Sequence, residues 1–415
     1  MSRHPGRLTS LASAVVTALL ASALCSLPAS AQQQVEFRGN IPLAPTGIAN
    51  QQLGNGPWHY ATAEGMNITV EVAARGIEYP MALTFLPDGD MLVVSRPGKL
   101  HRVRNGQLTE VTGNPPSVFF GVSGEPAVSH GYLDIALHPD FASNQLVYIA
   151  YSKPFGTQER GRSLAVGRGR WTGTALEGFT DIWGGNDGTV NGAARIAFGK
   201  DKTLYIATSG GDAQDLKIAG GKVLRVNDDG SIPANNPYAT SNDARHDLYS
   251  YGHRSSLGLT VHPATGAIWQ NENGPNGGDE INIIEPMKNY GWPLVSLGRD
   301  YSGPWQSEGP HHLGYQPPVV YWTPAIAVSG MTFYTSDVMP KWKGGLFVGS
   351  LRTGEVPGTG HLERIVLNEK YEELRRETLL VDLHQRMRDV KQGPDGFLYV
   401  ATEEKDGVVL RIKPE

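Results

Sequence analysis

The sequence predicts an all-β protein, and more specifically a six-bladed β-propeller. First, its 415 residues include 51 Gly and 28 Pro, a composition typical of a chain with many turns. Second, its apolar residues alternate with a period of two in short runs, and no long segment follows the helical period. Third, one strand–turn–strand unit recurs six times along the chain.

The recurring unit consists of an apolar strand, a turn rich in Pro, Asp or Gly, and a second apolar strand. The six units begin at Leu83, Ile135, Ile196, Leu259, Met331 and Val390. Successive starts lie roughly 50 to 70 residues apart, which suits a four-stranded sheet with one or two long loops. Such a sheet cannot bury its faces alone, whereas six of them around a common axis can. A large β-sandwich is the alternative, and the sixfold recurrence favours the propeller.

The segments between the repeat cores carry most of the polar residues that could bind or react. In a propeller, such long loops gather largely at one end of the central channel, where ligands usually bind. The segments are residues 186–195, 207–222, 249–258, 269–293, 349–361 and 384–391. We therefore expect a binding site at that end of the channel.

Residues 1–31 have the pattern of a secretory signal peptide. Two arginines precede an apolar run over Leu11–Leu27, and the small residues Ala29–Ala31 supply a cleavage site. A membrane anchor is the alternative, but Ser and Thr interrupt the run and Pro28 ends it. We therefore expect export with cleavage, a periplasmic or secreted location, and no membrane span in the mature protein.

The rest of the chain is predicted to contain an irregular lead-in over 32–58 and the propeller over 59–415. The single cysteine, Cys25, lies in the segment that is removed, so the mature protein has neither a disulfide nor a catalytic thiol. A net charge of -5 gives no electrostatic case for binding nucleic acid. The sequence also lacks a dinucleotide-binding glycine motif, a Walker loop, a Gly-x-Ser-x-Gly elbow and a His-Glu-x-x-His zinc motif.

A glycine-rich turn over Asn271–Asn282, followed by Lys288–Pro293, is a candidate calcium site. Gly and Pro hold the backbone in a turn whose carbonyl oxygens can point outwards together, and Asp279 and Glu280 add carboxylate oxygens. Hard oxygen donors without His or Cys suit Ca²⁺ rather than zinc. The alternative is a glycine-rich turn that Asp279 caps, and the spacing of an EF-hand loop is missing.

Three arginines in the loops between blades are candidate ligand-binding residues: Arg254, Arg386 and Arg388. On a strand, positions 386 and 388 point to the same face. Two guanidinium groups that face one channel suggest a ligand with several carboxylates or carbonyls. The alternative is that they pair with Asp389 and with other acidic residues.

Together these stretches resemble the soluble quinoprotein sugar dehydrogenases, the glucose/sorbosone and aldose sugar dehydrogenase family that uses pyrroloquinoline quinone (PQQ). The resemblance runs from residue 75 to residue 413. Its motifs are Gly131–Phe141, Ala213–Leu216, Gly221–Arg225, Asn273–Asn282, Asn289–Pro293, Ser329–Phe333, Arg386–Val390 and Gly393–Gly396. They occur in order and are spread over all six predicted blades, which makes the resemblance specific.

The resemblance implies an activity and a place for the cofactor. PQQ would lie across the channel mouth, where arginines matching Arg254, Arg386 and Arg388 hold its carboxylates and quinone oxygens. The protein would be an exported oxidoreductase that transfers hydride from a sugar or related alcohol to PQQ, with Arg254 stabilising developing oxyanion charge. The particular sugar, the electron acceptor and the oligomeric state are not specified.

The resemblance also implies two calcium ions. The backbone carbonyls of Gly274 and Pro275 match those that hold a Ca²⁺ ion which polarises the quinone. A second, structural calcium would use Glu280 and Tyr290.

The catalytic position departs from the family pattern. The family's catalytic His lies in an Asn-His-x-Gly-Gly-Arg stretch, and alignment on Arg195 places Asn191 where this base should be. A neutral amide cannot take the hydroxyl proton as hydride leaves the sugar. His130, in a loop ahead of the second repeat, is a candidate substitute, and a loop histidine with a purely structural role is the alternative.

Other cofactor-facing positions depart as well. Ser255–Leu257 replaces Asn-Pro-Gln, Arg352 replaces a Lys, and Asn273 replaces Gln or His. These changes leave two alternatives to a working dehydrogenase. One is a catalytically impaired propeller that acts as a carbohydrate- or protein-binding module. The other, by fold analogy alone, is a calcium-dependent lactone hydrolase.

Overall fold

A computed structural model describes most of the chain. The described residues are 52–117, 130–154, 162–184, 193–301, 303–307, 309, 313–354 and 360–415, with 37–38, 41–42 and 356–357. The chain divides into two units, Met1–Gln34 and Val35–Glu415, and every described residue belongs to the second. The predicted signal peptide and Asn191 lie outside the described residues.

The described part of the chain is almost entirely β-structure. Its helical segments are single turns at Phe141–Asn144 (α1), Pro340–Trp342 (η1) and Val381–Leu383 (η2). Among the described residues, no helix has the length and apolar character needed to cross a membrane. The expectation of strands throughout is therefore confirmed.

The first three blades are four-stranded antiparallel sheets whose strands follow one another along the chain. The first blade contains β5 (Pro80–Phe85), β6 (Met91–Ser95), β7 (Lys99–Arg104) and β8 (Gln107–Glu110). The second contains β9 (Tyr132–Leu137), β10 (Leu146–Pro154), β11 (Arg162–Trp171) and β12 (Leu176–Gly184). The third contains β13 (Ala194–Phe198), β14 (Leu204–Thr208), β15 (Lys222–Val226) and β16 (Leu248–Tyr251).

The next two blades repeat this pattern, except that a short hairpin lies between the second and third strands of the fifth blade. The fourth contains β17 (Ser256–Val261), β18 (Ile268–Glu272), β19 (Asp279–Ile284) and β20 (Val320–Trp322). The fifth contains β21 (Val328–Phe333), β22 (Leu346–Ser350), β25 (Leu362–Leu367) and β26 (Glu373–Leu379). Two further short hairpins are β1 (Phe37–Arg38) with β2 (Ile41–Pro42), and β23 (Arg352–Thr353) with β24 (Val356–Pro357).

The sixth blade joins the two ends of the propeller. The C-terminal strands β27 (Met387–Gln392), β28 (Leu398–Thr402) and β29 (Gly407–Pro414) are completed by β4 (Asn67–Ile77) and β3 (Trp58–Ala61). Strand β29 pairs antiparallel with β4, and the Arg411 and Lys413 side chains of β29 both bind Glu71 of β4. This pairing closes the ring of blades.

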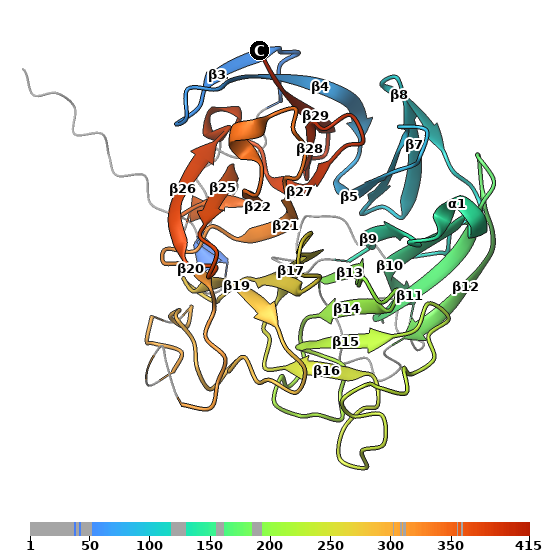
Figure 1. Cartoon of the computed structure of the whole chain (residues 1–415), viewed down its shortest axis with the longest axis vertical. Coiled ribbons are helices and arrows are strands. Elements are labelled where there is room, and N and C mark those ends of the chain that lie inside the picture. Colours follow the sequence, from blue (N-terminus) through green and yellow to red (C-terminus); the bar gives the residue numbers. More distant parts are fainter. Residues whose placement is uncertain are drawn as a thin grey trace, which may run out of the picture. The chain divides into compact units, whose positions relative to one another are not determined.

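The first strands of the six sheets form the inner ring. β5, β9, β13, β17, β21 and β27 pack each against the next, and β27 packs against β5 (Figure 1). The six-bladed propeller is therefore confirmed, and the β-sandwich alternative is wrong. The six repeats seen in the sequence coincide with the first two strands of the six blades.

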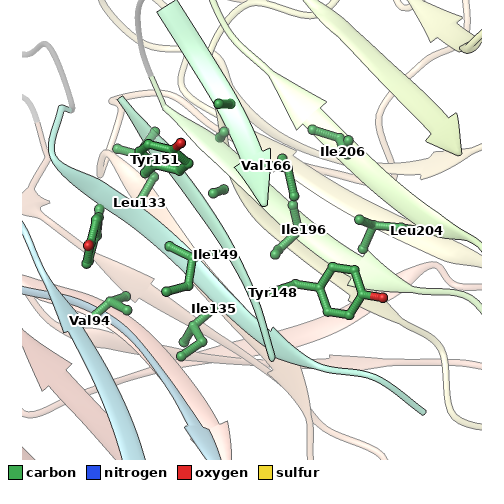
Figure 2. Close-up of a cluster of buried hydrophobic side chains, with 14 of the residues drawn as sticks. Val94, Leu133, Ile135, Tyr148, Ile149, Tyr151, Val166, Ile196, Leu204 and Ile206 are labelled. Atoms are coloured by element: carbon green, nitrogen blue, oxygen red, sulfur yellow. The ribbon is translucent and has the colours of Figure 1, made fainter. Parts of the chain in front are cut away.

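The core lies between neighbouring blades. Figure 2 shows Ile135 and Ile149 of the second blade with Val94 of the first blade on one side and Ile196 of the third on the other. The second strand of a blade is buried on both faces, which explains why its sequence is a continuous apolar run. Each such side chain stabilises the fold by about 1.5 to 3 kcal/mol.

The strand directions bring the predicted site residues to one end of the channel. Because neighbouring strands are antiparallel, the start of each first strand and the end of each second strand meet at the same edge of a blade. Arg254 and Arg386 lie just before β17 and β27. Asn273 and Arg352 lie just after β18 and β22. Residues far apart in the sequence thus share one channel mouth.

Candidate functional site

Arg254 lies at the centre of the first half of the site. Its Nη1 donates hydrogen bonds to the carbonyl oxygens of Asn273 (2.9 Å) and Gly274 (2.7 Å). Its guanidinium carbon lies 5.0 Å from the ring centre of Trp292 and 5.9 Å from that of Tyr301. The Gly274 carbonyl that the resemblance assigns to calcium therefore already faces a positive charge.

A fully buried histidine, His253, helps to fix the backbone at Arg254. The two ring nitrogens of His253 lie 2.9 Å from Ser250 Oγ and 3.2 Å from Glu272 Oε2. The same Glu272 oxygen accepts the backbone N–H of Arg254 at 3.2 Å. His253 also stacks on Tyr290, with ring centres 4.5 Å apart. These contacts fix the backbone from which the Arg254 side chain projects.

The Gly274–Pro275 turn is held by Asp279. One carboxylate oxygen of Asp279 accepts the Gly274 N–H at 3.0 Å, and the other accepts the Ile326 N–H at 2.9 Å. Burial raises the pKa of this carboxyl. A Cβ atom at Gly274 would lie 2.2 Å from the Gly277 carbonyl oxygen, so the turn requires glycine there. Asp279 does cap the turn, and the calcium site on Gly274 and Pro275 stays a prediction.

The residues predicted to bind a structural calcium lie beside this turn. Glu280 on β19 is directly opposite Glu272 on β18, and burial together with Glu272 raises the pKa of Glu280. The Tyr290 hydroxyl donates to the Ile283 carbonyl at 2.6 Å and accepts the Glu285 N–H at 2.9 Å. Within the described ranges, no group of three or more His, Cys, Asp or Glu side chains is placed to hold a metal. The structural calcium stays a prediction.

The second half of the site is an arginine cluster around Glu403. Arg386 Nη2 lies 3.1 Å and Arg388 Nε 2.7 Å from the same oxygen of Glu403. Arg96 lies 3.0 Å from the other oxygen. The two predicted arginines do point to one side, but their partner is Glu403 and not the neighbouring Asp389.

Burial makes this cluster electrostatically unusual. Burial lowers the pKa of Arg388 to about 9, although Glu403 opposes this shift. Burial tends to raise the pKa of Glu403, but the charges of Arg388, Arg96 and Arg386 hold it well below its usual range. Three guanidinium groups share this one carboxylate. The cluster therefore keeps an excess of positive charge at the channel mouth.

Among the arginines assigned to the site, Arg388 through Nη1 and Arg352 through Nε carry buried N–H groups with no hydrogen-bond partner among the described residues. Arg352 adjoins Leu351, whose carbonyl accepts a hydrogen bond from Arg386 Nη1 at 3.2 Å. An unsatisfied buried donor costs about 1 to 3 kcal/mol, and more when charged. Carboxylate or quinone oxygens would satisfy these donors, so the residues present fit a group such as PQQ.

The remaining predicted residues contribute less to the observed contacts. Ser255 accepts the Asn273 N–H through its backbone carbonyl at 2.9 Å, and the Asn273 side-chain amide donates to the Val328 carbonyl at 2.8 Å. His130 is buried, with 1% of its surface exposed. Because Asn191 lies outside the described residues, the position of the base stays a prediction.

Sequence reasoning missed several residues of the site. Arg96 and Glu403 each directly follow the second strand of a blade, as Asn273 does in the fourth blade. Comparison of that one position across all six repeats would have found them. Trp292 and Tyr301, which flank Arg254, lie in the long connection between β19 and β20. Trp292 belongs to the Lys288–Pro293 stretch, but its contact with Arg254 was not predicted.

Comparisons with known proteins agree with this architecture. The family described as Glucose / Sorbosone dehydrogenase matches residues 77–411. An aldose sugar dehydrogenase of Escherichia coli is 36% identical over 360 residues, which cover 84% of this chain and 93% of that protein. The apo crystal structure of the soluble aldose sugar dehydrogenase from E. coli has a TM-score of 0.75 at 35% identity, covering 84% of this chain and 100% of that one. The PQQ-bound aldose sugar dehydrogenase of Streptomyces coelicolor has a TM-score of 0.65 at 28% identity, covering 87% and 100%.

Proposed function

Because the chain belongs to the glucose/sorbosone dehydrogenase family, we propose that it is an exported quinoprotein that transfers hydride from a sugar or related alcohol to PQQ with the assistance of Ca²⁺. The observation that carries the proposal is the arginine-lined channel mouth. Arg388 and Arg352 hold buried N–H groups that lack partners among the described residues. Such donors suit a flat ligand with several carboxylates and carbonyls.

The cofactor would be held by residues from three blades. Arg254, Arg352, Arg386 and Arg388 would bind its carboxylate and quinone oxygens, with Ser255 and Asn273 beside them. The carbonyls of Gly274 and Pro275 would bind the calcium ion. When bound, PQQ supplies the acceptor for the electron pair and Ca²⁺ polarises it.

Arg254 is the residue that we assign to charge stabilisation. Its guanidinium is fixed by two backbone carbonyls and lies over two aromatic rings, so it needs little rearrangement when negative charge develops on an oxygen. The aromatic rings of Trp292 and Tyr301 keep part of the water away from this charge, which strengthens its effect.

The proton of the sugar hydroxyl needs a separate acceptor. We propose that Asn191 occupies the family's base position and leaves this step poorly catalysed, with His130 as the candidate substitute. A lost general base costs about 10²- to 10⁴-fold in rate. The same change motivates the second candidate function, a carbohydrate- or protein-binding propeller that no longer catalyses the oxidation.

The proposal is tested by adding PQQ and Ca²⁺ to the purified protein and following the absorbance of bound quinone. Aldoses and related alcohols are then screened with an artificial dye acceptor. Stoichiometric binding and reduction by any sugar would support the dehydrogenase. Stoichiometric binding without reduction would favour the impaired propeller, and no binding at micromolar PQQ would exclude a quinoprotein. Lactone hydrolysis by calcium-loaded, quinone-free protein that is lost on adding EDTA would point to the hydrolase instead.

A further inference from the structure

The loop that joins β14 to β15, residues 209–221, begins at the channel mouth and surrounds a buried ammonium group. Lys222, the first residue of β15, is 0% exposed. Its Nζ donates hydrogen bonds to the carbonyl oxygens of Asp212 (3.1 Å), Ala213 (3.1 Å) and Gly220 (2.6 Å). A lysine ammonium has three donors, so this loop, which we call the cage loop, satisfies all of them.

The ammonium group is charged at neutral pH despite its burial. Burial lowers the pKa of Lys222 to about 8, and the charges of Asp212 and Asp215 oppose this shift. Moving a charge into the protein interior is costly, and hydrogen bonds to carbonyl oxygens offset part of that cost. The three carbonyl oxygens in turn need a donor, because a buried polar group without a partner destabilises the fold. The cage loop and the ammonium therefore depend on each other.

The cage loop is hydrogen-bonded to the segment that precedes Arg254. The Gly252 N–H donates at 3.1 Å to the Ala213 carbonyl, which also binds the ammonium. The His253 N–H donates to the Gly221 carbonyl at 3.1 Å. A Cβ atom at Gly221 would lie 2.6 Å from the His253 carbonyl oxygen, so the two backbones are in close contact. The cage loop therefore fixes the backbone that leads into Arg254.

Gln214 links the cage loop to the aromatic side of Arg254. Its Nε2 donates to the Trp292 carbonyl at 2.6 Å, and its Oε1 accepts a hydrogen bond from Asn289 Nδ2 at 2.7 Å. The Trp292 N–H donates to the Gly252 carbonyl at 2.9 Å. The centre of the Trp292 ring lies 5.0 Å from the guanidinium carbon of Arg254. The cage loop thus contacts both segments that position this guanidinium.

We propose that Lys222 is a positioning residue for the cofactor site, whose ammonium group acts as an internal cation that holds the cage loop and through it orients Arg254. Because Lys222 has no exposed surface, it acts through Arg254 and not by contact with the cofactor. This inference rests on the proposed function, which assigns Arg254 to cofactor binding and charge stabilisation.

The test uses Lys222→Met, which nearly preserves the length of the side chain and removes its charge. Arg225→Met is the matched control, because Arg225 is 6% exposed on the same strand but binds Asp201 at the opposite edge of the blade. Amide hydrogen exchange of residues 249–254 is measured on the quinone-free protein. The Kd for PQQ is measured by quinone absorbance for each variant, alone and combined with Arg254→Met.

We expect Lys222→Met to accelerate hydrogen exchange over residues 249–254 and to raise the Kd for PQQ by about tenfold, as for coupled residues of one hydrogen-bond network. Arg225→Met should change either quantity by no more than about twofold. In the protein that carries Arg254→Met, Lys222→Met should change the Kd by less than about twofold, because no guanidinium is left to orient. A tenfold loss that persists in this background would show a general structural role and would overturn the inference. Unchanged hydrogen exchange in Lys222→Met would also overturn it.

Gln214→Ala gives a second test that leaves the buried ammonium in place. Removing the link to Trp292 should raise the Kd for PQQ by about three- to tenfold. If Lys222→Met does not fold, an unchanged Kd in Gln214→Ala would overturn the inference. If even the unaltered protein binds no PQQ, the proposed function fails, while hydrogen exchange still decides whether the cage loop holds the segment before Arg254.

Discussion

Arg195 on β13 of the third blade lies 3.6 Å from Asp389 on β27 of the sixth blade, on the opposite side of the ring of inner strands. The same guanidinium donates to the Leu257 carbonyl at 2.7 Å and to the Arg388 carbonyl at 3.1 Å, and it lies 3.3 Å from Asp134. One buried side chain therefore ties four blades together across the channel. Through the Arg388 carbonyl it also contacts the backbone of one of the arginines that we assign to the cofactor.

The first prediction concerns the contribution of Arg195 to stability. Arg195→Met should lower the free energy of unfolding by about 3 to 5 kcal/mol, because it removes the ion pair of buried Asp134 and leaves buried Asp389 with only Lys391, 3.7 Å away. The measurement is urea unfolding followed by fluorescence. Arg170→Met is the matched control, since the exposed Arg170–Glu177 pair should contribute no more than about 0.5 kcal/mol. Equal effects of the two substitutions would contradict the assignment of Arg195.

The fold was predictable because its signal is repeated. Each repeat core combines a first strand that is buried except within its last two residues with a fully buried second strand, and this gives the same apolar pattern six times. The completion of the sixth blade was not predictable in this way. Strand β29 pairs with β4 at the other end of the chain, and neither strand carries the repeated pattern.

The site was predictable in part. Motifs identified Arg254, Arg386 and Arg388, but the neighbouring Asp389 was the wrong partner to consider. The pairing of β27 with β28 is irregular between Met387 and Asp389, so Arg388 has no partner in the register. Asp389 accepts the Leu83 N–H of the next blade at 3.0 Å, while Arg388 binds Glu403, which follows β28. Such a contact depends on which strands are neighbours, and one sequence does not specify it.

The second prediction concerns cofactor affinity. Arg386→Gln should raise the Kd for PQQ by about ten- to hundredfold, because it removes a charged donor from a partly buried site. Titration of quinone absorbance measures this. Arg411→Gln is a control in the same blade, since Arg411 binds Glu71 away from the channel mouth. A similar loss of affinity in both variants would show that the effect is not specific to the site.

The third prediction concerns pH. Burial raises the pKa of Glu404 to about 7, although Arg386 opposes the shift. Glu404 accepts the Arg386 backbone N–H at 3.2 Å, so its charge lies close to the arginine cluster. Above pH 7 it becomes negative, and the affinity for the anionic cofactor should fall by roughly three- to tenfold between pH 6 and pH 8.

The raised pKa of Glu404 also makes the free energy of unfolding depend on pH. A carboxyl with a raised pKa binds its proton more tightly in the folded protein, so the free energy of unfolding should fall as pH rises from the ordinary value of 4.5 towards about 7. Glu404→Gln should reduce both pH dependences. If the variant keeps the full pH dependence of PQQ binding, another group is responsible.

The last prediction concerns the missing base. Asn191→His should raise kcat for sugar oxidation by about 10²- to 10⁴-fold, because an imidazole can accept the hydroxyl proton that an amide cannot. Asn191→Ala is the control for a change of size alone and should leave kcat low. The measurement is dye reduction at saturating sugar, with PQQ binding determined for each variant. If Asn191→His binds PQQ normally and gains no activity, while His130→Ala lowers the activity of the unaltered protein by at least about 10²-fold, then His130 is the base that the chain uses.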